Sequence, residues 1–157
     1  MTQSVTSTSL YERLGGTYGI AGAVDVLTDR LYDNQSANRN PHVAAFHGEM
    51  GHAGFKFLVT AWSIEKSGGP ACYPGRDMRE SHAHLFVSEL EFDIVKTEIA
   101  ATLYHVGVPE QEHGEFMTII ESYRDMVVGA PGAKAETDPV EAAQVTEGQT
   151  EREPVPA

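Results

Sequence analysis

The sequence has 157 residues and a formal net charge of −12, with 23 acidic residues against 11 basic ones. One domain is the expectation at this length, and such a chain can bury a sizeable hydrophobic core. A strongly acidic chain repels phosphate groups, which argues against nucleic acid and anionic membranes as partners. The single cysteine, Cys72, leaves no intrachain disulfide to form.

The two ends of the sequence differ in composition from its middle. Residues 1–8 are polar and rich in Ser and Thr, without the basic start and apolar core of a secretory signal. We therefore expect a flexible N-terminus and a cytoplasmic protein. Residues 129–157 hold no aromatic side chain, and such a segment cannot bury enough apolar surface to fold. This predicts a disordered acidic tail after a folded domain over residues 9–128.

In the first half of the domain, helices are expected between pairs of glycines. A short helical turn over residues 10–14 ends at Gly15-Gly16. Apolar side chains then recur at intervals of four, three and four, which is typical of one face of an amphipathic helix. The helix expected at about 52–66 is followed by glycine and proline, which commonly end a helix. The later helices are expected at about 18–32, around 43–46 after Pro41, and at about 52–66, with breaks at Gly48 and Gly51 and at Gly68-Gly69-Pro70.

In the second half, a short helix is expected within residues 76–85, and two longer helices follow. Ser88 and Glu91 have the spacing of a capping box, which predicts a helix start there. The apolar positions that we expect to be buried are Phe92, Val95, Ile99, Leu103 and Val106 in one helix, and Phe116, Ile119, Ile120, Tyr123 and Val127 in the next. No strand pattern occurs, so the predicted fold class is all-α.

A histidine pair offers the clearest chance of cofactor chemistry. His82 and His84 follow a glycine-proline loop, and on a helix their side chains would diverge by about 200°, so they could not both hold one metal there. No HExxH motif and no CxxC pair occurs, which makes a zinc hydrolase a weak reading. Several helices carry bulky apolar faces, which suits a flat apolar cofactor such as haem held by one axial nitrogen. Spacing alone does not decide whether His82 or His84 is the ligand, nor whether the ligand holds zinc or haem.

Five motifs, met in order along the chain, resemble the group I truncated haemoglobins. They are SLYERLGG at 9–16, GGPACYPGRDM at 68–78, SHAHL at 81–85, EFD at 91–93 and GVPEQE at 107–112. The resemblance covers about residues 9–128. It implies a two-over-two helical globin fold and one haem b, bound without covalent attachment. It also implies that His82 is the proximal ligand of the iron and that His84 lies outside the ligand position.

The distal positions depart from what the family usually shows, which is a tyrosine and glutamines that hydrogen-bond bound oxygen. The matching positions here fall at Thr28, Phe55 and Val59, so the resemblance implies a mostly apolar distal pocket with Thr28 as its main polar candidate. The remaining candidates for haem contact are Phe46 or His47, Trp62, Tyr73 and Met78, with Lys56 and Arg76 as partners of the haem propionates.

Two versions of the distal site follow from these residues. In the first, which we favour, the site is open and apolar, so that oxygen dissociates or oxidises the iron readily. In the second, His47 or His52 becomes a sixth ligand of the iron, as in a redox or sensor globin.

Three classes of function are compatible with the sequence. The favoured one is reversible binding of O2, NO or CO, with oxygen transport within this class. A nitric oxide dioxygenase or a peroxidase-like enzyme is the second and would need a reductase partner or a distal acid–base group. A helical interaction protein without haem is the third.

Overall fold

A computed structural model describes residues 7–128, and all regular elements in this part of the chain are helices. In chain order these are α1 (Leu10–Arg13), α2 (Gly16–Asp33), the 3-10 helix η1 (Ala37–Arg39), α3 (Pro41–Lys66), α4 (Met78–His82), α5 (Glu89–His105), α6 (Glu110–Ser122) and α7 (Arg124–Val127). The predicted all-α class is confirmed. The predictions for residues 1–6 and for the tail over 129–157 lie outside the described residues.

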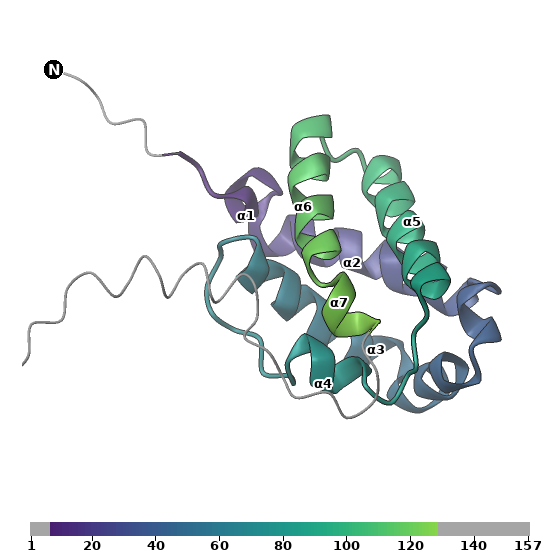
Figure 1. Cartoon of the computed structure of the whole chain (residues 1–157). Helices are drawn as coiled ribbons and strands as arrows, with labels where there is room; N and C mark the ends of the chain where they lie inside the picture. The colour runs from purple at the N-terminus through teal and green to yellow at the C-terminus, as the bar shows by residue number, and fades with distance from the viewer. Residues whose placement is uncertain (1–6, 129–157) are drawn as a thin grey trace, which may run out of the picture.

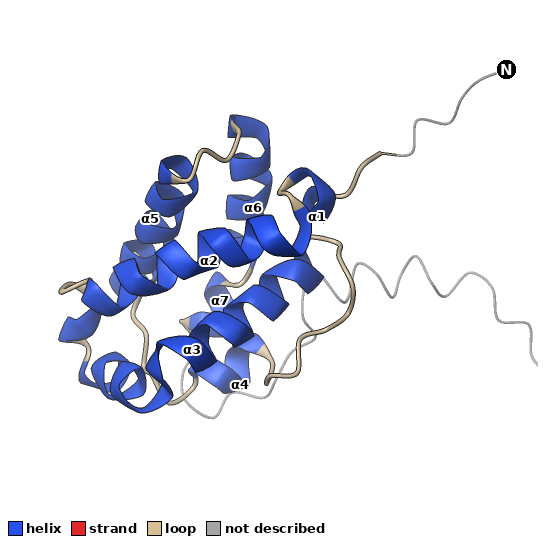
Figure 2. Cartoon of the chain, turned by 180° about the vertical axis from the view of Figure 1, so that it is seen from behind, coloured by secondary structure: helices blue, strands red, loops and turns tan. Residues whose placement is uncertain are grey.

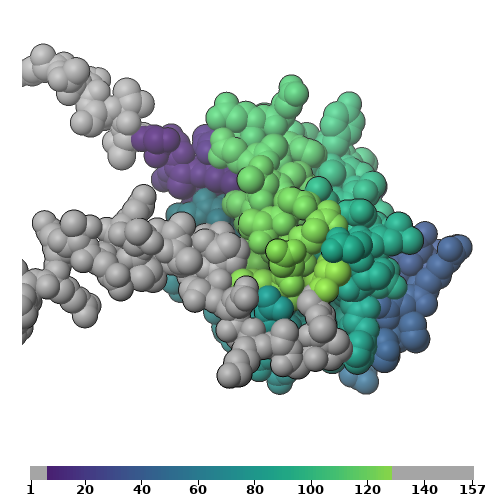
Figure 3. All heavy atoms as spheres, viewed as in Figure 1, coloured from purple at the N-terminus to yellow at the C-terminus, as the bar shows by residue number. Residues whose placement is uncertain are grey.

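Two pairs of long helices form the body of the molecule. α2 packs against α3 and also against α5, while α5 packs against α6. Figure 1 shows α5 and α6 side by side with α2 crossing behind them, and Figure 2, from behind, shows α2 next to α3. The short helices complete this arrangement, because α1 contacts α2 and α6 and α4 contacts α7. In the space-filling view, α6 and α7 form much of the front face, with α1 at its edge (Figure 3).

Capping boxes fix the start of two helices. The Glu91 amide donates to Ser88 Oγ at 3.2 Å and the Ser88 amide donates to Glu91 Oε2 at 2.8 Å, which confirms the predicted start of α5. Ser9 and Glu12 make the same reciprocal pair at α1. The second box was missed by the sequence analysis although it has the same spacing of serine and glutamate.

The element α3 consists of two helical segments that meet at a kink, which confirms the predicted break at Gly51. Gly48 does not interrupt it. Gly51 does depart from helical geometry, with φ 67° and ψ 162°, a conformation that glycine adopts far more readily than other residues. The Tyr32 hydroxyl donates to the Gly51 carbonyl at 3.1 Å. The kink therefore gives the segment 41–50 a direction different from that of 52–66.

The last predicted helix is instead two helices that meet at Tyr123. This residue is only 1% exposed, and its ring meets Trp62 edge to face with centroids 5.3 Å apart. Because the break shifts the helical register, Met126 is buried in place of the predicted Val127. Val106, which was also predicted to be buried, is 39% exposed at the end of α5.

The hydrophobic core has two clusters of buried residues. The larger joins α1, α3, α5, α6 and α7, and the smaller joins α2 to α3. The larger consists of Leu10, Trp62, Leu103, Phe116, Tyr123 and Met126; the smaller consists of Ile20, Val24 and Ile64. Among the described residues, no helix combines the length and the hydropathy that crossing a membrane requires.

The buried side chain of Asn40 joins three parts of the chain through hydrogen bonds. Its Oδ1 accepts from the amides of His42 at 2.9 Å and Val43 at 3.3 Å, which caps α3. Its Nδ2 donates to the Leu85 carbonyl at 2.9 Å and to Glu91 Oε2 at 3.1 Å. The start of α3, the loop after α4 and the start of α5 are therefore joined through one side chain that is 5% exposed.

We predict that Asn40→Ala lowers the free energy of unfolding by about 2–4 kcal/mol, because both a helix cap and buried hydrogen bonds are lost. Asn40→Ser keeps a capping oxygen without reaching Leu85 and should lose about half as much. Urea unfolding followed by circular dichroism measures both changes.

The control for this prediction is Ser36→Ala, at an exposed position whose side chain makes no capping hydrogen bond. A change of less than about 0.5 kcal/mol is expected there. An Asn40→Ala variant as stable as the Ser36→Ala control would contradict the role given to Asn40.

Candidate functional site

His82 lies at the end of α4 with its ring held in one orientation. Its Nδ1 is 2.8 Å from the Met78 carbonyl oxygen and 2.9 Å from Ser81 Oγ. A carbonyl oxygen only accepts, so Nδ1 carries the proton and donates. The Ser81 hydroxyl donates to the same carbonyl at 3.1 Å. In neutral His82 the lone pair is therefore on Nε2, which is the arrangement required of a metal-ligating imidazole.

Burial lowers the pKa of His82, the Met78 hydrogen bond partly opposes this shift, and nearby His84 adds a small lowering effect. The imidazole is consequently neutral at pH 7. A neutral ring with a fixed Nδ1–H is able to offer Nε2 to a metal without first losing a proton.

The short helix α4 is held by contacts at both of its ends. Asp77 caps its start by accepting from the Glu80 amide at 2.8 Å. Before it, the Tyr73 hydroxyl donates to the Arg76 carbonyl at 2.8 Å. After it, the Leu85 amide donates to the His82 carbonyl at 2.9 Å, and Leu85 is buried. These contacts, together with the hydrogen bonds that Asn40 makes to Leu85 and Glu91, fix the position of His82 although α4 is only five residues long.

The predicted distal residues present little that can donate a hydrogen bond. Phe55 and Val59 are partly buried on α3, and their side chains have no polar atom. Thr28 is fully buried, and its hydroxyl donates to the Val24 carbonyl at 2.8 Å. The only hydroxyl proton in this trio is thus already used within α2.

A cluster of aromatic and imidazole rings lies where α2 approaches the kink in α3. The Tyr32 ring is stacked on His47 with centroids 4.2 Å apart, and it meets His52 at 4.2 Å and Phe55 at 5.5 Å, both edge to face. Phe46 joins the cluster through Phe55 at 6.3 Å. We call these five side chains the ring cluster.

The Asn38 side chain defines the proton position of His47, which belongs to the ring cluster. The Asn38 amide nitrogen donates to the carbonyls of Tyr32 and Asn34, both at 2.9 Å. This leaves Asn38 Oδ1 as the acceptor for His47 Nδ1 at 2.8 Å. Neutral His47 therefore also has its lone pair on Nε2, and burial followed by the nearby charge of His52 lowers its pKa.

His52 is placed differently. Its Nδ1 is 3.0 Å from Asp29 Oδ1 on α2, and its side chain is 48% exposed. It therefore lies at the outer side of the ring cluster, paired with a surface carboxylate.

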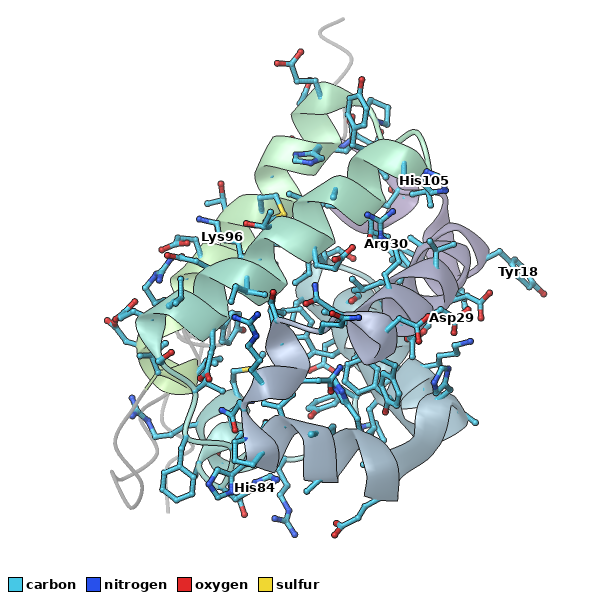
Figure 4. The ribbon with its side chains drawn as sticks, turned by 90° about the vertical axis from the view of Figure 1, so that its right-hand side faces the viewer. Tyr18, Asp29, Arg30, His84, Lys96 and His105 are labelled. Atoms are coloured by element: carbon cyan, nitrogen blue, oxygen red, sulfur yellow. The ribbon has the colours of Figure 1, made fainter. Side chains whose placement is uncertain are left out.

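The two predicted cations lie at the surface and have carboxylate neighbours. Lys56 Nζ is 2.6 Å from Asp25 and 3.3 Å from Asp29, and its hydrogen bond to Asp25 is the main reason that its pKa is raised. Arg76 has a side chain that is 72% exposed and lies 4.0 Å from Glu80. Figure 4 shows Asp29 on the outside of α2.

Apart from His82, Thr28 and the two cations, the predicted site residues fall into three groups. Phe46, His47 and Phe55 meet in the ring cluster. Trp62 belongs to the larger core cluster, and Tyr73 and Met78 pack against it, whereas Val59 packs against the smaller cluster. Sequence reasoning missed Tyr32 altogether. Its position four residues after Thr28, on the same face of one helix, was the signal available.

Comparison with known proteins agrees with this arrangement. A family model described as "Bacterial-like globin" matches residues 9–128. The chain belongs to this globin family. It is also 32% identical over 130 residues to a group 1 truncated haemoglobin of Synechocystis, covering 80% of this chain and 94% of that protein. The predicted membership of the group I truncated haemoglobins is confirmed.

Solved structures of truncated haemoglobins share the fold of this globin. The 2/2 haemoglobin of Synechococcus sp. PCC 7002, in the cyanomet state with covalently attached haem, is 27% identical with a TM-score of 0.69, and the match covers 77% of this chain and 98% of that one. The Fe(III) truncated haemoglobin of Tetrahymena pyriformis is 26% identical with a TM-score of 0.69, covering 78% and 99% of the two chains. The predicted two-over-two globin fold is therefore confirmed.

Proposed function

We propose that this truncated haemoglobin binds small diatomic ligands reversibly at a haem iron held by His82. Haem is the cofactor of this globin, and its iron supplies the binding of O2, NO or CO. The observation that carries the proposal is the bare Nε2 of a neutral, half-buried His82 whose Nδ1 donates to the Met78 carbonyl. Partly buried Met78, Phe55 and Val59 supply apolar surface of the kind that haem requires.

Because of the distal residues, we expect a bound ligand to be stabilised only weakly. A diatomic ligand that becomes polarised on binding is stabilised by hydrogen-bond donors. Phe55 and Val59 offer none, and the Thr28 proton is committed to the Val24 carbonyl. We therefore propose an open, mostly apolar distal site from which oxygen leaves quickly.

A sixth ligand from the protein is the second candidate, and the ring cluster favours His47 over His52 for that role. Both rings donate through Nδ1, so both have an unprotonated Nε2 when neutral. His47 lies in ring contact with Phe55 at 6.3 Å, whereas His52 is paired with the carboxylate of Asp29 and its side chain is 48% exposed. The kink at Gly51 gives the segment that carries His47 a point about which to move. The His47 imidazole is also the group to test if the protein is a nitric oxide dioxygenase or a peroxidase-like enzyme. Such an enzyme would need a reductase as its partner. The compartment that we propose is the cytoplasm.

The first prediction concerns His82. In His82→Gly, the Soret band that haem shows in the wild-type protein should be lost. Added imidazole should restore this band, because a free imidazole can replace the missing ligand. His84→Gly, two residues away, is the matched control and should keep the wild-type spectrum. A His82→Gly variant with an unchanged spectrum, without imidazole, would exclude His82 as the proximal ligand.

The second prediction concerns the distal side. Val59→Gln introduces a donor and should slow oxygen dissociation about tenfold, the effect of one hydrogen bond of roughly 1.4 kcal/mol. Thr28→Val should change the rate less than twofold, because the Thr28 hydroxyl already donates to Val24. Stopped-flow absorbance measures both rates. A large change in Thr28→Val alone would show that Thr28, not position 59, controls the ligand.

The third prediction distinguishes the open site from internal ligation. With an open site, the ferric protein shows high-spin absorption bands. If low-spin bands appear instead, His47→Ala should remove them and His52→Ala should leave them unchanged. Low-spin bands that survive both substitutions would rule out both histidines as the sixth ligand.

A further inference from the structure

The first part of α3 forms a segment that is attached mainly at its ends. Residues 41–50, which we call the flap, precede the kink at Gly51, and none of them is buried. Asn40 caps one end of the flap, and the Tyr32 hydroxyl holds the Gly51 carbonyl at the other. A segment with few buried contacts unfolds locally at a small cost in free energy. The flap can therefore open while both of its ends stay in place.

Two ring contacts join the flap to the loop over residues 83–88, which follows α4. The centroids of the His42 and Phe86 rings are 4.7 Å apart, and those of the Phe46 and His84 rings are 6.1 Å apart. His42 and Phe46 are four residues apart in a helix, so they lie on one face of the flap. That face is therefore the one that meets the loop.

The loop gives these two rings a fixed base. Leu85, between His84 and Phe86, is buried, and its carbonyl accepts a hydrogen bond from Asn40 at 2.9 Å. His84 and Phe86 are both exposed. Figure 4 shows His84 at the edge of the molecule, next to the first part of α3. The loop is thus anchored at Leu85, and the side chains before and after it contact the flap.

Phe86 has an unusual conformation for a large apolar residue. Its side chain is 52% exposed. Its φ is 50°, and it is the only residue other than glycine with a positive φ within residues 7–128. This left-handed conformation costs a side chain free energy that glycine avoids, and residues held in it cluster at functional sites. The chain therefore has a phenylalanine where glycine would be less strained, and the phenylalanine ring contacts His42.

The ring contacts lie beside the proposed haem site. Phe46, one of the predicted haem contacts, belongs to the flap and also meets Phe55 at 6.3 Å. The loop begins directly after His82, the last residue of α4. The ring contacts therefore join the part of the chain that carries the proposed proximal ligand to the part that carries the predicted distal residues.

We propose that the flap closes one edge of the haem site and that the His42–Phe86 contact, with Phe46–His84 beside it, sets how fast haem leaves. The role depends on haem being bound by His82, as in the proposed function. While the rings are in contact, the flap keeps water from the apolar surface on which haem packs. Haem leaves when the flap unfolds locally. Phe86 is a positioning residue, because it acts on haem through the flap.

Transfer of haem from the ferric protein to an excess of a high-affinity apoglobin measures this role. Phe86→Ala removes the ring and should raise the rate of haem loss about five- to tenfold, the effect of one aromatic contact. Phe57→Ala is the matched control, at a phenylalanine of α3 that is 62% exposed and lies outside the flap. It should lose haem within about twofold of the wild-type rate. A Phe86→Ala variant that loses haem as slowly as this control would overturn the proposal.

Phe86→Gly separates the effect of the ring from that of the backbone strain. Both Phe86→Gly and Phe86→Ala lack the ring, but only glycine relieves the positive φ. Phe86→Gly should therefore unfold at a higher urea concentration than Phe86→Ala and yet lose haem equally fast. If haem loss instead follows overall stability and is slower in Phe86→Gly than in Phe86→Ala, Phe86 has only a structural role and the proposal is wrong.

A double variant tests the contact itself. His42→Ala and Phe86→Ala remove the two sides of one contact, so the double variant should lose haem no faster than the faster single variant. Single effects that multiply in the double variant would show that the two residues act separately, against the proposal.

Hydrogen exchange of the haem-loaded protein tests the opening of the flap. In Phe86→Ala, amides of residues 41–50 should exchange about five- to tenfold faster than in the wild type, and those of residues 52–66 should be unchanged. Unchanged exchange in residues 41–50 would refute the flap. A chain that takes up no haem would refute the proposed function, whereas a haem-loaded chain with unchanged haem loss in Phe86→Ala refutes the role of Phe86 alone.

Discussion

The proposed chemistry of this globin depends on one hydrogen bond, from His82 Nδ1 to the Met78 carbonyl. It fixes the proton on one ring nitrogen and leaves the other with its lone pair. Burial disfavours the charged ring and so keeps the imidazole neutral. Without this bond, either nitrogen of His82 could carry the proton, and the ring could turn.

Because α4 is too short to be stable on its own, this hydrogen bond requires support from the rest of the fold. Asp77 caps α4 and Leu85 anchors the chain after it. Asn40 then connects this loop to the starts of α3 and α5. One polar network thus joins the loop after His82 to the starts of α3 and α5.

Much of the fold was predictable from the sequence because its signals are local. The apolar repeat of α2 and the Ser88–Glu91 capping box each depend on residues within a few turns, and the structure has both. The break at Tyr123 and the stacking of Tyr32 on His47 were not predictable in this way. They arise from contacts between helices. The same limit applies to Lys56, whose pairing with Asp25 depends on how α2 and α3 pack.

The assignment of His82 remains the central claim, and a crystal structure of the haem-loaded protein tests it most directly. We predict the iron at bonding distance from His82 Nε2, with Nδ1 still donating to the Met78 carbonyl. Iron bound by His84 in place of His82, or a His82 ring turned so that Nδ1 faces the iron, would contradict this assignment.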